Sequence, residues 1–133
     1  MEKVGELLGW LAAVCYFAAV ANLVVKRLYQ VRIAKLPKDN AFRRGYQFLM
    51  QRIVRYHRYF GVGAGVFALC HLCWQLVNVR LSYSGVLVTA LMTATALMGI
   101  LILKGKKKDL VKVHRPLALT VLAVILFHMI TKL

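Results

Sequence analysis

Four long apolar segments dominate this chain of 133 residues. They cover residues 4–25, 56–79, 81–103 and 111–130, and 61% of the whole chain is hydrophobic. Each segment has about the 20 residues that an α-helix needs to cross a bilayer. Backbone groups inside a bilayer must be hydrogen-bonded within the protein, so such segments are expected to be helices. The sequence therefore predicts an all-α membrane protein, with residues 1–133 forming a single transmembrane four-helix domain.

The basic residues lie mostly on one side of these segments. Nineteen Lys and Arg stand against four Asp and Glu, and only Lys3, Arg80 and Lys132 fall outside the two connections 26–58 and 104–115. The positive-inside rule places both connections in the cytoplasm and both termini outside. Glu2 and Glu6 flank Lys3, so a positive signal-peptide start is missing and the first segment is expected to remain as a helix.

This asymmetry predicts an integral protein of the plasma or inner membrane, N-out and C-out, in contact with membrane lipid. A strongly basic chain could also bind nucleic acid, but a soluble nucleic-acid binder would not need four apolar segments. We therefore expect no nucleic-acid partner. The sequence is compatible with either a monomer or an oligomer.

Short connections favour an up-down bundle of the four helices. The exception is a basic cytoplasmic loop at residues 26–55. Within it, Phe42, Tyr46, Leu49 and Ile53 recur at helical spacing among arginines. That pattern suits either an interfacial helix or a cytoplasmic extension of the second helix.

The four histidines form two pairs with equal spacing. Fourteen residues separate His57 from His71, and fourteen separate His114 from His128. Fourteen residues of helix rise about 21 Å, and two heptads return to the same seam of a left-handed bundle. The second and fourth helices run parallel in an up-down bundle, so His57 should lie level with His114, and His71 with His128.

Two imidazoles that face each other at one depth can bind an iron from both sides, as axial histidines do in haem proteins. The helix face between His57 and His71 is small, with Gly61 and Gly65 among alanines. Small residues make room for a macrocycle, although they also promote ordinary helix packing in membranes. We therefore predict two haem groups, with His57, His114, His71 and His128 as the iron ligands and Gly61 and Gly65 beside the cofactor.

Arg58 and Arg115 directly follow the first histidine of each pair. Guanidinium groups bind carboxylates well, so these two residues are candidates for the haem propionates, or else simply topological charges. Cys70 and Cys73 flank His71, but a covalent c-type site needs the histidine after the second cysteine.

The segments Tyr56-His57-Arg58-Tyr59-Phe60-Gly61 and His114-Arg115-Pro116-Leu117, with His71 and His128, resemble the dihaem core of b-type membrane cytochromes. The likeness is strongest to the ferric-reductase-like transmembrane family and covers residues 52–131. The resemblance implies that the two haems are non-covalent haem b and that the function is transmembrane electron transfer. This chain differs from larger members in having four helices and no nucleotide-binding domain within its sequence.

Three functions follow from these patterns. The first is a dihaem cytochrome that passes electrons between a cytoplasmic-side redox partner, soluble or membrane-bound, and an outer-face acceptor. The second is a quinol-linked membrane-anchor subunit of a larger oxidoreductase, with a quinone site. Polar residues such as Tyr16, Asn22, Gln75 and Asn78 could line that site, but they more often bond between helices. The third is a non-redox transporter or scaffold with a histidine relay.

Overall fold

Four α-helices make up nearly all of the computed structural model, which describes residues 2–79, 82–105 and 108–132. They are α1 (Glu2–Val31), α2 (Ala41–Asn78), α3 (Tyr83–Gly105) and α4 (Lys108–Lys132), with a 3-10 turn η1 (Ile33–Lys35) after α1. All four are long and apolar enough to cross a membrane, which confirms the prediction of four such helices. Arg80, counted above among the charges, lies outside the described residues.

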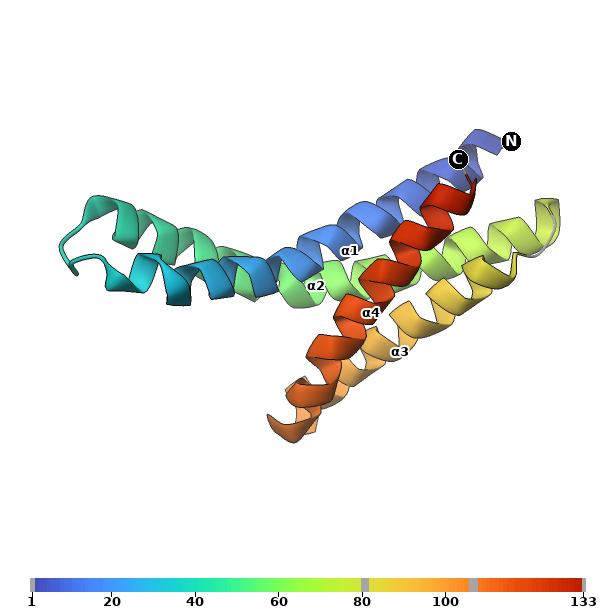
Figure 1. The fold of residues 1–133 in the computed structure, drawn as a ribbon. Coiled ribbons are helices and arrows are strands. Elements are labelled where there is room, and N and C mark those ends of the chain that lie inside the picture. The colour runs from blue at the N-terminus through green and yellow to red at the C-terminus, as the bar shows by residue number, and fades with distance from the viewer. Residues whose placement is uncertain (1, 80–81, 106–107, 133) are drawn as a thin grey trace.

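The helices form an up-down arrangement (Figure 1). The two termini lie at the same end as the α2–α3 connection, and the α1–α2 and α3–α4 connections lie toward the other end. α1 packs most extensively on α2, and α3 packs on both α2 and α4. The α1–α2 and α3–α4 pairs diverge away from the termini, so the molecule is open at that end.

Residues 26–55, predicted as a loop that contains a helix, are mostly continuous helix. α2 begins at Ala41 rather than near residue 56, because the Asn40 side chain caps it and accepts hydrogen bonds from the Phe42 and Arg43 amides (2.9 and 3.2 Å). Leu36 is extended, as expected before Pro37, and separates η1 from this cap. The alternative of an extended second helix is therefore confirmed, and the separate interfacial helix is wrong.

We call residues 26–50, with their connecting turn, the arm. It is a helical hairpin that projects past the end of α3 and α4 (Figure 1). The Tyr46 hydroxyl donates to the Val25 carbonyl (3.0 Å), and Gln47 Nε2 donates to the Tyr29 hydroxyl (2.6 Å). The rings of Tyr29 and Tyr46 stack with centroids 6.2 Å apart. These contacts hold the two halves of the arm together along its length.

The buried core occupies the middle of the bundle. It receives two or three side chains from each helix, and Val121 is fully buried at its centre. The Tyr16 hydroxyl crosses this core and donates to the Ala118 carbonyl of α4 (2.8 Å). The core residues are Ala12, Tyr16, Val20, Ala64, Ala68, Val88, Met92, Val121 and Ile125.

Much apolar surface stays outside this core. The accessible surface is 9304 Å², whereas a compact soluble protein of this mass exposes about 7,000 Å². Large side chains such as Val14, Leu87, Leu101 and Phe127 are more than half exposed on the outer faces of the spans. An apolar exterior on four long helices is typical of a membrane protein.

Candidate functional site: two levels of histidine

His57 of α2 and His114 of α4 face each other across the bundle. Their ring centroids are 6.3 Å apart and their planes are inclined by 82°. Imidazole nitrogen binds a first-row metal such as zinc at about 2.0–2.1 Å, so two rings that hold one ion from opposite sides have centres roughly 6–6.5 Å apart. The pair that the sequence predicted to be level is therefore brought together at a spacing that fits one metal ion between the rings. We call His57 and His114 the first level.

Backbone carbonyls of α1 orient both histidines of α2. Nδ1 of His57 donates to the Ala19 carbonyl and Nδ1 of His71 donates to the Gly5 carbonyl, both at 2.8 Å. A carbonyl can only accept, so each Nδ1 carries the proton. The Nε2 lone pair of each ring is then free for a metal ion, which is the tautomer that protein metal sites usually select.

The spacing of fourteen recurs on the other two helices. On α1, the carbonyl acceptors Gly5 and Ala19 are fourteen residues apart. On α3, a Cβ at Gly85 would lie 3.4 Å from Cε1 of His128, and a Cβ at Gly99 would lie 3.6 Å from Cε1 of His114. Gly85 and Gly99 are also fourteen residues apart. Each histidine level is therefore built from all four helices, and the two levels are two heptads apart.

His71 of α2 and His128 of α4 define the second level. Nδ1 of His128 is hydrogen-bonded to the Ser84 hydroxyl (2.9 Å), next to Gly85 at the start of α3. A Cβ on Gly9 of α1 would lie only 3.2 Å from Cε1 of His71, so this glycine lets α1 approach the ring. The core of the bundle lies almost entirely between the two levels.

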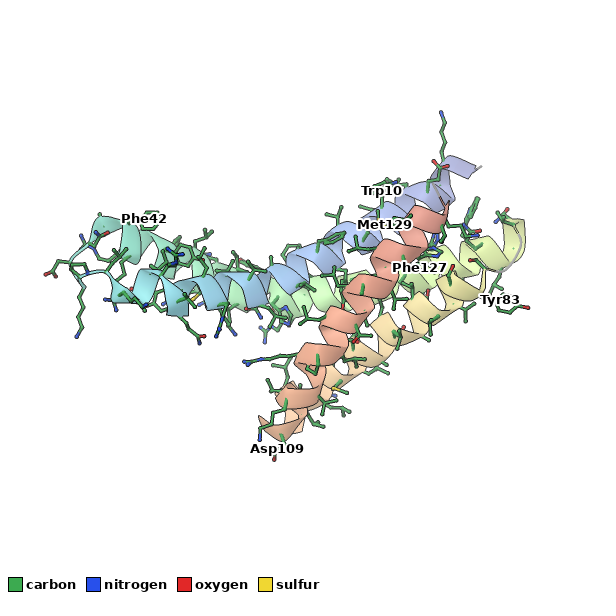
Figure 2. The ribbon with its side chains drawn as sticks, in the orientation of Figure 1. Trp10, Phe42, Tyr83, Asp109, Phe127 and Met129 are labelled. Carbon is green, nitrogen blue, oxygen red and sulfur yellow. The ribbon has the colours of Figure 1, made fainter. Side chains whose placement is uncertain are left out.

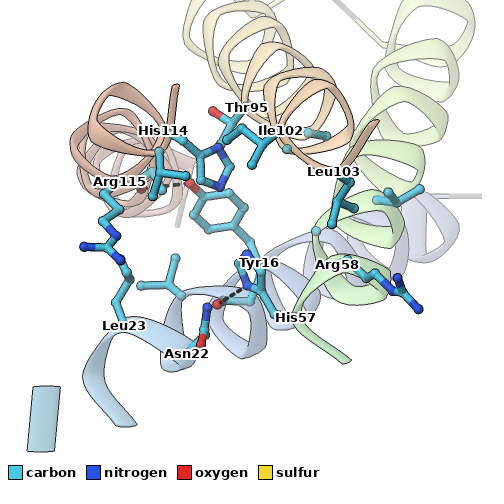
Figure 3. Close-up of a pocket in the computed structure, with 18 of the residues that line it drawn as sticks. Tyr16, Asn22, Leu23, His57, Arg58, Thr95, Ile102, Leu103, His114 and Arg115 are labelled. Carbon is cyan, nitrogen blue, oxygen red and sulfur yellow. Dashed lines mark hydrogen bonds between the residues drawn. The ribbon is translucent and has the colours of Figure 1, made fainter. Parts of the chain in front are cut away.

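A cavity of about 460 Å³ opens at the first level (Figure 3). Its volume falls within the range of about 300–1,000 Å³ found for cofactor sites. His57 and His114 both line it, and small residues widen it from three helices: Gly61, Ala96, Gly99 and Ala118. The space around Gly61 is open, because a Cβ added there would meet no heavy atom of the described residues within 4 Å. A large flat group therefore has room beside the two imidazoles.

The second predicted glycine has a different place. A Cβ on Gly65 would contact Cβ of Ala96 at 3.6 Å, and Gly65 is buried between α2 and α3. Gly65 serves close helix packing in this structure, and the cavity lining includes Gly61 but not Gly65. The small residues between His57 and His71 could make room for a cofactor or allow close helix packing. Gly61 fits the first explanation, and Gly65 fits the second.

Cationic side chains gather at one end of the cavity. Lys26, Arg55, Arg58 and Arg115 all contribute to its lining. The Arg58 guanidinium lies 4.8 Å over the Tyr59 ring and donates to the Tyr59 hydroxyl, so it is held on its own helix. In Figure 3 the guanidinium groups of Arg58 and Arg115 point outward on opposite sides of the cavity. Both predicted arginines thus border the site without contacting the histidines.

Asn22 is a further polar group in the cavity lining. Its side chain is 7% exposed, and Oδ1 has no hydrogen-bond partner among the described residues. A buried polar atom without a partner costs about 1–3 kcal/mol, which a bound group can recover. Nδ1 of His114 is likewise buried and unpartnered within the described chain. From the sequence, Asn22 was a candidate only for a quinone site, whereas the structure places it one helical turn from Ala19 at the first level.

Within the described residues, His, Cys, Asp and Glu form no group of three or more that could hold a bare metal ion. A haem iron needs only two protein ligands, because the macrocycle supplies the others. The donor set of two facing imidazoles therefore fits haem better than a protein-only metal site.

Comparison with known proteins adds nothing to this geometry: no family model, curated protein or solved structure matches the chain.

Proposed function

We propose that the chain is a dihaem b-type cytochrome that transfers electrons across a membrane. The observation that carries the proposal is the 6.3 Å separation of the His57 and His114 rings. His71 follows His57 by fourteen residues, and His128 follows His114 by fourteen, so the same arrangement is expected at a second level. Bis-histidine ligation leaves no open position for oxygen or substrate, so it suits electron transfer.

Haem at each level would supply a one-electron iron couple. His57 and His114 would hold the first group and His71 and His128 the second. The Ala19 and Gly5 carbonyls fix the tautomer of the α2 ligands and raise their basicity, which tunes the potential of a bound metal. Gly61, Gly99 and Ala118 leave the space, and the cationic end of the cavity, with the Asn22 amide nitrogen as a further donor, would bind carboxylate groups.

The two levels are about 21 Å apart along the helices, which spans most of the roughly 30 Å hydrocarbon core. The packed apolar core lies between them and would keep water out of this interval. We further propose that the basic connections lie in the cytoplasm and the termini outside, in a plasma or inner membrane. Electrons would then pass between a cytoplasmic redox partner and an outer-face acceptor.

The quinol-linked alternative uses the same haems and adds a quinone site. The other polar residues of the spans do not favour one. The Tyr16 hydroxyl is bonded to Ala118, and Asn78 Nδ2 donates to the Trp74 carbonyl of its own helix. A histidine relay would need acidic side chains as hydrogen-bond partners of the imidazoles. The hydrogen bonds of His57 and His71 go to backbone carbonyls instead, and that of His128 goes to a hydroxyl.

The test is an optical spectrum of the purified full chain, with haem counted by pyridine haemochrome and potentials measured by redox titration. We expect two haem b per chain and two resolvable potentials. A protein expressed with ample haem that shows no Soret band and no reducible α band would overturn both haem functions together. Copurification of a catalytic subunit or a quinone would move the conclusion to the quinol-linked version.

A further inference from the structure

The tip of the arm carries charge and apolar surface that the haem site does not use. We define the tip as residues 35–44, the turn between η1 and α2 with its flanks. It holds four basic residues and one acidic residue. In Figure 2, Phe42 marks this tip at the end of the molecule farthest from Tyr83 and Trp10. The Phe42 side chain is 62% exposed, and among the described residues neither α3 nor α4 packs on this part of the chain.

The tip has a fixed shape. Asn40 caps α2, and the Asn40 amide donates to the Pro37 carbonyl (3.1 Å). Arg43 Nη1 donates to the Leu36 carbonyl (2.6 Å), so this guanidinium closes the turn. Lys35, Lys38 and Arg44 are exposed. The structural cation and the exposed cations are therefore different residues, and the exposed ones share the tip with Phe42 and with one exposed acid, Asp39.

Lipid headgroups are a poor match for this surface. With the membrane placed as proposed above, the charge-free part of α1 ends at Val25, and the nine residues from Lys26 to Lys35 rise about 14 Å. A headgroup layer is about 5–8 Å thick, and charges in solution are screened within about 8 Å. With the arm upright, the tip stands about 6–9 Å beyond the headgroups, close to the screening distance, and Phe42 does not reach the hydrocarbon.

A second copy of the chain is also a poor match. Two basic tips facing each other would repel, since like charges across an interface cost free energy. Exposed aromatic residues among arginines are, in contrast, the composition that protein interfaces favour. We propose that the tip of the arm is a docking site for a soluble protein with an acidic surface, which binds Lys35, Lys38 and Arg44 around a central Phe42. That this protein is an electron carrier rests on the proposed function, whereas its acidic character does not.

The experiment starts with the full chain in its native cells, with the photoreactive residue benzoylphenylalanine in place of Phe42. Position 113 is the matched control, since Val113 is 53% exposed near the start of α4. We expect one discrete adduct from position 42, with a soluble acidic protein, and none of it from position 113. An adduct with lipid, with a second copy of the chain or with a basic protein, or no adduct specific to position 42, would overturn the proposal.

The protein found in the adduct is then purified and titrated against the full chain in phosphatidylcholine nanodiscs. Lys38→Gln/Arg44→Gln should weaken Kd roughly 3- to 30-fold, since two exposed ion pairs are lost. The matched variant Lys104→Gln/Lys112→Gln, on exposed cations beside the other basic connection, should change Kd by less than about 2-fold. Equal effects of the two double variants would contradict a specific site at the tip.

The two proposals fail separately. The titration is repeated with His57→Ala, which removes a haem ligand but no tip residue, and we expect the same Kd. If a chain without haem still binds the acidic protein through its tip, only the proposed cytochrome function is refuted. If the chain holds two haems but its tip variants bind the acidic protein with unchanged Kd, only the proposed docking site is refuted.

Discussion

Gly9→Ala should weaken haem binding at the second level and spare the first. The new methyl group would lie 3.2 Å from Cε1 and 3.4 Å from Nδ1 of His71, which is tighter than ordinary van der Waals contact. The ring cannot simply retreat, because its Nδ1 is held by the Gly5 carbonyl at 2.8 Å. Overpacking of this kind costs about 1–3 kcal/mol, and it is relieved only if the ring leaves the position in which it would hold haem.

This cost of about 1–3 kcal/mol is borne when His71 holds haem, and it corresponds to roughly a 5- to 150-fold loss of affinity for the second haem. The assay is titration of haem into the apoprotein, with each level followed by its own potential. Gly45→Ala is the matched control, since nothing lies within 4 Å of a Cβ there, and it should leave both affinities unchanged. Equal weakening of both levels, or no weakening at all, would refute the argument that Gly9 sets the position of His71.

Three further perturbations probe the first level and the core. Asn22→Leu should stabilise the apoprotein by about 1–3 kcal/mol, because it removes a buried amide whose oxygen has no partner. It should also weaken binding of the first haem, because the amide is lost from the cavity lining. Chemical denaturation measures the first effect, and haem titration measures the second. Tyr16→Phe should destabilise the bundle by about 0.6–1.5 kcal/mol through loss of the bond to the Ala118 carbonyl, read out by unfolding in mixed detergent. Arg115→Gln should lower the first haem potential by roughly 20–60 mV, because a cation that opposes the oxidised state is lost; an unchanged potential in redox titration would exclude Arg115 from the site.

The paired histidines are visible in the sequence because both the residue type and the spacing carry the signal. Their partners are not visible in the same way. Gly5 and Ala19 act through backbone carbonyls, which every residue possesses, so only the packing of α1 on α2 reveals them. Gly85 and Gly99 did carry a usable signal, since they repeat the same spacing of fourteen on α3.

The arm was harder to predict because hydropathy detects membrane spans rather than helices. Four arginines and two glutamines keep residues 41–55 from reading as a membrane span. Arg, Gln, Leu, Met and Ala are good helix formers, and they follow an Asn cap, so α2 extends well beyond its apolar part. The roles of the two glycines also needed the structure. Gly61 faces the cavity and Gly65 faces Ala96, and the difference depends on where α3 approaches α2.

The pairing of ligands across helices is the central claim, and single alanine variants of the four histidines test it most directly. Each purified variant is examined for haem content and for the potentials that remain. We predict that His57→Ala and His114→Ala lose the same haem, and that His71→Ala and His128→Ala lose the other. Loss of one shared haem by His57→Ala and His71→Ala, or two haems retained in all four variants, would contradict the account.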